Sequence, residues 1–170
     1  MPSSVKFTPK ELTQLGILLA LAIALRLAEN ALAYLLPLPG AHLGLANAIT
    51  IIVLYLYGTK KTLLFLVARI LLVGLLFTGL FSPGFCIGLG GALLSFAAMS
   101  KAQEINTFSG VGIGVLGAFC HNVGQIIVAM LLMRSQALLS YLPLLILLGI
   151  PTGIFTGLVA KISLQQLKKI

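Results

Sequence analysis

Long apolar segments, separated by short breaks of proline, glycine and polar residues, make up almost the whole chain. A helix needs about 20 apolar residues to cross the hydrocarbon core of a bilayer. The pattern therefore predicts an all-α membrane protein in which residues 1–170 form a single integral membrane domain. Six transmembrane helices are expected, over residues 12–36, 43–57, 62–81, 85–99, 111–133 and 138–160. The second and fourth are short, so either flanking residues extend them or they begin in irregular backbone buried within the bundle.

Composition and charge support this class and predict an orientation. Hydrophobic residues make up 59% of the chain and charged residues 8%, against about 25% charged in a soluble domain. With the N-terminus inside, the outer side holds only Arg134, whereas the inner side holds Lys6, Lys10, Lys60, Lys61, Lys101, Lys161, Lys168 and Lys169. Because basic loops stay on the cytoplasmic side, both termini are predicted to be cytoplasmic. This distribution accounts for most of the net charge of +8, so the expected partner is the lipid bilayer and no nucleic acid.

Ionisable and amide side chains within the predicted spans are the candidates for a binding site, because such groups are costly in lipid. Arg26 and Glu29 lie three residues apart on one helix face, and His121 and Gln125 lie one turn apart. Most of these groups fall in the outer half or centre of the bilayer, where we expect them to converge on a cavity open to the outside. The candidate substrate-binding residues are Arg26, Glu29, His42, Asn47, Arg69, His121, Asn122 and Gln125.

Several of these residues also have simpler structural explanations. Arg26 and Glu29 could neutralise one another, and Arg69 could instead pair with Glu29 to hold the bundle together. Asn47 could merely cap a helix. His42 is expected in an exposed loop, although that loop could fold over a ligand. Two cysteines and two histidines make neither a disulfide framework nor a zinc site of the usual spacing, so no metal or cofactor is expected.

Small residues recur at every fourth position in three segments, which places each stripe on one helix face. The stripes are Gly16, Ala20, Ala24 and Ala28 in the first segment, Gly110, Gly114 and Ala118 in the fifth, and Gly149, Gly153 and Gly157 in the sixth. Helices in lipid associate through close packing of small side chains, so the last two stripes are expected to pack inside the bundle. For the first stripe, internal packing and docking on another membrane subunit are equal alternatives.

Three stretches of the sequence carry a resemblance to a bacterial membrane family. They are Pro39-Gly40-Ala41-His42-Leu43-Gly44-Leu45-Ala46-Asn47, Gly90-Gly91-Ala92-Leu93-Leu94-Ser95, and Gly117-Ala118-Phe119-Cys120-His121-Asn122-Val123-Gly124-Gln125. The chain resembles the Gx transporter family, many members of which are labelled heptaprenyl diphosphate synthase component I. The His-Asn-x-Gly-Gln element is the most specific part. Family members usually have a lysine before Leu-Gly-Leu-Ala-Asn, where this chain has His42.

That family is in turn similar to the substrate-binding S components of energy-coupling factor (ECF) vitamin transporters. The resemblance implies an S-component-like bundle of six helices in a bacterial cell membrane, with both termini inside. It also implies a substrate near the outer side, under the loop that joins the first two helices. An Ala-x-x-x-Ala face of the first helix, matched here by Ala20, Ala24 and Ala28, would dock on a transmembrane coupling subunit powered by two ATPases.

The sequence argues against an enzyme. A chain-elongating prenyl diphosphate synthase holds diphosphate through magnesium bound to aspartate-rich motifs, since hard cations prefer carboxylate oxygens. This chain has no aspartate and only three glutamates, Glu11, Glu29 and Glu104, which lie far apart. It also has no G-x-x-x-x-G-K-[ST] loop for ATP. We therefore expect no catalytic residues.

The leading hypothesis is a membrane protein that captures a small molecule from outside and delivers it through an ATP-driven ECF module. Arg26 and Arg69 would face an anionic or carbonyl-bearing group of that substrate, and the amides and imidazole would supply hydrogen bonds. The alternative is a non-catalytic membrane subunit associated with a polyprenyl (heptaprenyl) diphosphate synthase. A stand-alone carrier is less well supported, because no inverted repeat is evident.

Overall fold

The computed structural model describes residues 6–33, 44–106 and 108–167 of the chain, and these residues are almost entirely helical. The elements are α1 (Pro9–Ala33), α2 (Leu45–Val73), a π-helical turn (Gly74–Thr78), α3 (Pro83–Ile105), α4 (Gly110–Met133), a 3-10 turn (Gln136–Tyr141) and α5 (Leu142–Leu167). Five helical stretches in the described residues are long and apolar enough to cross a membrane. The prediction of an all-α, multi-pass membrane protein is therefore confirmed at this level.

Local capping chemistry explains where two of the helices begin. At the start of α1, the Thr8 amide donates to Glu11 Oε2 at 2.9 Å and the Glu11 amide donates to Thr8 Oγ1 at 3.2 Å. This reciprocal pair is a capping box, and it starts the helix three residues before the predicted Leu12. At α3, Ser82 Oγ accepts a hydrogen bond from the Phe85 amide, and Pro83 occupies the first helical turn, where its missing N–H costs nothing.

Two helices extend beyond the spans expected from the sequence. The fourth predicted segment was expected to end at residue 99, but α3 continues through Ile105 and ends where Asn106 takes a left-handed conformation with φ of 55°. Flanking residues therefore extend this short segment, which is the first of the two explanations considered for its length. The sixth segment also differs: α5 begins at Leu142 and continues to Leu167, beyond the expected end at residue 160.

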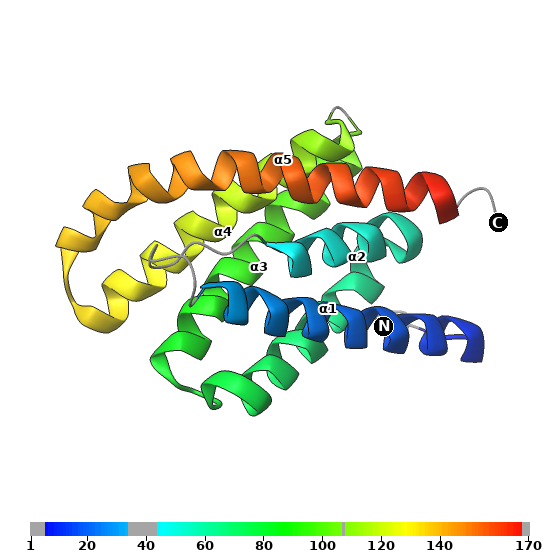
Figure 1. Ribbon diagram of the computed structural model, residues 1–170, viewed down its shortest axis with the longest axis horizontal. Helices are drawn as coiled ribbons and strands as arrows, with labels where there is room; N and C mark the ends of the chain where they lie inside the picture. The colour runs from blue at the N-terminus through cyan, green and yellow to red at the C-terminus, as the bar shows by residue number, and fades with distance from the viewer. Residues whose placement is uncertain (1–5, 34–43, 107, 168–170) are drawn as a thin grey trace, which may run out of the picture.

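The helix α2 folds back on itself at Gly58. Two helical halves meet at Gly58, which has a non-helical φ of 74° and ψ of 174°, a conformation that a glycine adopts readily. Arg69 Nη1 donates to the carbonyl of Ala46 at 2.5 Å, although 23 residues of straight helix would separate these positions by about 35 Å. The two halves of α2 therefore lie side by side (Figure 1). The break predicted between the second and third segments is thus a sharp reversal at one residue.

The helix α4 is packed closely between α3 and α5 through glycines. A β-carbon added at Gly114 of α4 would lie 2.8 Å from the Cα atom of Gly157 in α5. On the other side of α4, a β-carbon at Gly124 would lie 2.9 Å from Gly91 Cα in α3. Backbone therefore meets backbone at both contacts, and the predicted internal packing of the small-residue stripes in α4 and α5 is confirmed.

The helix α1 lies at the edge of the bundle, beside α2 (Figure 1). Its inward face buries Leu15, Ala22 and Glu29. The stripe of small residues lies on the opposite face, where Gly16, Ala20, Ala24 and Ala28 are all exposed. No atom lies within 4 Å of a β-carbon built at Gly16. Of the two alternatives for this stripe, internal packing is therefore wrong for the described part of the chain.

Candidate binding pocket

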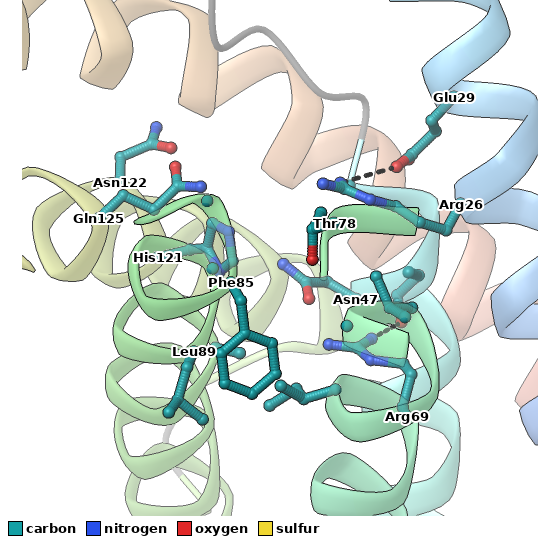
Figure 2. Close-up of a pocket in the computed structure, with 18 of the residues that line it drawn as sticks. Arg26, Glu29, Asn47, Arg69, Thr78, Phe85, Leu89, His121, Asn122 and Gln125 are labelled. Carbon is teal, nitrogen blue, oxygen red and sulfur yellow. Dashed lines mark hydrogen bonds and ion pairs between the residues drawn. The ribbon is translucent and has the colours of Figure 1, made fainter. Parts of the chain in front are cut away.

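A cavity of about 130 Å³ lies among α1, α2, α3 and α4, and the π-helical turn and Thr152 of α5 complete its lining. Figure 2 shows two facing walls, with Arg26, Glu29, Asn47 and Arg69 on one side and His121 and Gln125 on the other. The predicted site residues that line it are Arg26, Glu29, Asn47, Arg69, His121, Asn122 and Gln125. The eighth predicted residue, His42, lies outside the described residues. Side chains from separate helices thus line one pocket, and their role in substrate binding stays a prediction.

Glu29 connects α1 to the beginning of α2. The residue is 4% exposed, and its carboxylate lies 3.6 Å from Arg26 Nη1 in an ion pair. Its other oxygen accepts a hydrogen bond from the backbone amide of Leu45. A carboxylate is stabilised at a helix N-terminus because the first amides of a helix are unpaired and carry partial positive charge. The predicted neutralisation of Arg26 by Glu29 is therefore present, together with a capping contact that the sequence did not suggest.

Arg69 is buried at 6% exposure and joins the two halves of α2. Its Nη1 atom donates to the Ala46 carbonyl at 2.5 Å and to Thr50 Oγ1 at 2.9 Å. The suggested ion pair between Arg69 and Glu29 is wrong, because the ion pair of Glu29 is formed with Arg26. Arg69 nevertheless lines the cavity, and its guanidinium group lies at the pocket edge in Figure 2.

Asn47 does not cap a helix. The N-cap of α2 is Gly44, which is left-handed with φ of 72° and has no side chain to cap the helix; the Leu45 amide is instead capped by Glu29. Figure 2 shows the Asn47 side chain between the Arg69 side and the His121 side of the pocket. The capping interpretation is therefore wrong, and the Asn47 amide is available to the cavity.

On α4, His121 and Gln125 face a glycine of α3. A β-carbon at Gly91 would lie 2.7 Å from Gln125 Cγ and 3.0 Å from His121 Cε1. Any larger residue at Gly91 would therefore push these two side chains out of their positions. Gly91, the second residue of the Gly90-Gly91 pair, thus allows two pocket side chains to take their positions.

Asn122 has a structural contact in addition to its place in the cavity wall. Its Nδ2 atom donates to the Leu145 carbonyl of α5 at 2.7 Å. Gly149 makes this approach possible, because a β-carbon there would lie 2.7 Å from Asn122 Nδ2. Asn122 therefore helps to hold α4 against α5.

The rest of the pocket wall is mainly apolar, and little in the sequence indicates it. These residues include Ile70, Val73, Phe85, Leu89, Ala92 and Thr78. Apolar residues within a transmembrane segment resemble every other lipid-facing or core position, so only the fold identifies them as pocket residues. Together the walls combine an apolar surface with a few directional polar groups, which is typical of small-molecule sites. Within the described residues, no group of three or more His, Cys, Asp or Glu side chains is placed to hold a metal ion.

A family model described as heptaprenyl diphosphate synthase component I matches residues 18–163, a range that includes every residue lining the pocket. No curated protein and no solved structure matches the chain.

Proposed function

Because the chain belongs to the heptaprenyl diphosphate synthase component I family, we propose that it is a non-catalytic membrane subunit that binds a small molecule and acts with partner proteins. The observation that carries the binding role is the pocket, where polar groups from three helices face an apolar wall. Groups so costly in lipid are retained at such positions when they serve a function.

The first candidate role is substrate capture for an ATP-driven module of the ECF type. In this role α2 crosses the bilayer twice, the chain crosses six times, both termini are cytoplasmic and the pocket opens to the outside. The exposed stripe of Ala20, Ala24 and Ala28 supports it, because small residues let a partner's helices approach α1 closely. The transmembrane coupling subunit would dock on this stripe, and its two ATPases would supply the energy.

The second candidate role is membrane attachment of a polyprenyl diphosphate synthase, and the family's name favours it directly. Catalysis would then lie on the partner. This chain has no aspartate, and each of its three glutamates forms an ion pair with a basic residue of the chain. Magnesium-bound diphosphate chemistry needs free carboxylates, which the partner would have to provide.

Affinity isolation from membranes of the source cell separates the two roles. Recovery of a membrane coupling subunit with ATPases supports capture, whereas recovery of a soluble prenyl synthase supports the second role. Ala24→Leu should abolish recovery of the ECF partner, because a bulky side chain separates the docking helices. Ala97→Leu, the same change at an exposed position of α3, is the matched control and should not. Equal recovery with both variants would rule out docking on this stripe.

A further inference from the structure

The carboxylate side chains of this protein can be accounted for completely. The sequence contains three, and all of them lie in the described residues. Glu11 pairs with Lys61 at 2.6 Å, and Glu104 pairs with Lys101 at 3.5 Å. Glu29 pairs with Arg26 at the pocket. No carboxylate side chain is therefore left to balance Arg69.

The surplus charge of Arg69 is buried. Its described hydrogen bonds go to a backbone carbonyl and a hydroxyl group, which satisfy donors but carry no net charge. Burying a cation without a counter-charge is costly, and more so within a membrane protein. The pocket thus holds two guanidinium groups and one carboxylate, a surplus of one positive charge.

Two helix N-termini add to this positive field. The start of α2 contributes Gly44, Ala46 and Asn47 to the pocket wall, and the start of α3 contributes Gly84 and Phe85. The N-terminus of a helix carries a partial positive charge from its unpaired amides. The start of α2 already holds the Glu29 carboxylate, so it is the start of α3 that further favours a negative group in the space that Arg69 borders.

The size and walls of the pocket limit the rest of the ligand. A cavity of about 150 Å³ accommodates benzene, and this one measures about 130 Å³. Ile70, Phe85 and Leu89 provide an apolar surface beside the charged wall. A diphosphate would bring more negative charge than the single surplus positive charge can balance, and no free carboxylate is present to hold a divalent cation with it.

We propose that the pocket binds a compact organic monoanion, with its charged group between Arg26 and Arg69 and its apolar body against Phe85 and Leu89. This inference rests on the proposed binding role and names the class of ligand for that role. A monoanion also differs in charge from the diphosphates that are substrates of a prenyl synthase.

Benzoate, benzamide and phenyl phosphate test the charge directly at pH 8, where they carry one negative charge, none and two. Binding to the detergent-purified protein is followed by the rise in melting temperature, since a ligand that binds only the folded state stabilises it. Benzoate should stabilise the protein and bind at least tenfold more tightly than benzamide, which corresponds to about 1.4 kcal/mol. Phenyl phosphate should bind more weakly than benzoate. Equal effects of benzoate and benzamide, tighter binding of phenyl phosphate, or no response to benzoate would overturn the proposal.

Charge variants should move the benzoate affinity in opposite directions. Arg69→Gln should weaken it at least tenfold, and Arg26→Gln gives a second test if Arg69→Gln does not fold. Glu29→Gln keeps an acceptor oxygen for the Leu45 amide but removes the negative charge, so it should strengthen benzoate binding. Arg134→Gln, at an exposed position that does not line the pocket, is the matched control and should change nothing. Weaker binding in Glu29→Gln would contradict an electrostatic role.

The molecule that co-purifies with the protein distinguishes failure of this inference from failure of the binding role. A neutral or cationic molecule, retained by the wild-type protein and lost when His121 and Gln125 are replaced by alanine, would overturn the monoanion and leave the binding role intact. A retained monoanion would support both. If neither a natural molecule nor benzoate binds, the binding role and the monoanion are both refuted.

Discussion

The helices α4 and α1 are similar in length and apolar character, yet they are held in the bundle in different ways. Glycines place the backbone of α4 against α3 on one side and α5 on the other. α1 contacts α2 along one face, and its small residues are exposed on the opposite face. The same sequence feature, a small residue at every fourth position, thus builds the interior in α4 and leaves an open surface in α1. Both helices carry pocket residues, but α4 is held on two sides by backbone contacts, whereas one face of α1 stays exposed.

The largest expected effect comes from the same substitution made in both helices. Gly114→Ala places a β-carbon against the backbone of α5, which cannot move without separating the helices, and should lower stability by about 2–3 kcal/mol. Gly16→Ala meets nothing within 4 Å and should raise stability by about 0.5–1 kcal/mol, because alanine favours a helix more than glycine. Unfolding of both variants in the same detergent measures the difference. Similar effects of the two changes would contradict the distinction between α4 and α1.

The next effect concerns the contact that attaches the end of α1 to α2. Glu29→Ala removes both the ion pair with Arg26 and the acceptor for the Leu45 amide, and should destabilise the protein by about 2 kcal/mol. Glu29→Gln keeps the acceptor and should cost less. Thermal melts of the two variants, measured side by side, give the comparison. If Glu29→Ala costs no more than Glu29→Gln, the capping contact does not hold α1.

Asn122 gives a smaller effect within the scaffold. Asn122→Ala loses the hydrogen bond to the Leu145 carbonyl and should lower stability by about 1 kcal/mol. Gln125→Ala lies about one turn along the same helix and removes a pocket amide that makes no hydrogen bond among the described contacts. This variant should therefore lose less stability than Asn122→Ala. Chemical unfolding of both variants checks the order. Equal losses would mean that the Asn122 bond contributes little to the α4–α5 contact.

The smallest effect is expected at the other end of α1. Glu11 pairs with Lys61 at 2.6 Å, but both side chains are partly exposed, and exposed ion pairs contribute little to stability. Glu11→Gln should therefore leave the melting temperature almost unchanged, and less changed than Glu29→Ala does. A loss as large as that of Glu29→Ala would show that α1 is held mainly from this end.

Much of this architecture could be predicted from apolar runs and glycine spacing. The membrane class, the packing of the stripes in α4 and α5, and the gathering of distant polar residues all follow from the high cost of polar groups and the close approach of small residues in lipid. These signals are periodic or chemically distinctive, and they do not depend on how the helices are arranged.

The remaining features depend on the three-dimensional arrangement and carry no local signal. The hydrogen bond from Arg69 to Ala46 exists only because α2 reverses at Gly58. Glu29 caps α2 only because the two helices approach each other, and Phe85 becomes a pocket residue only once α3 faces α2. The spacing of Arg26 and Glu29 suggests their ion pair, but the sequence does not show whether Arg69 also approaches Glu29.

Native mass spectrometry of the protein, isolated gently from membranes of its source cell, tests the central claim most directly. We predict one bound small molecule per chain in the wild-type protein and none when His121 and Gln125 are both replaced by alanine, with the variant still folded. A folded double variant that retains the same molecule, or a wild-type protein that carries none, would contradict a binding role for this pocket.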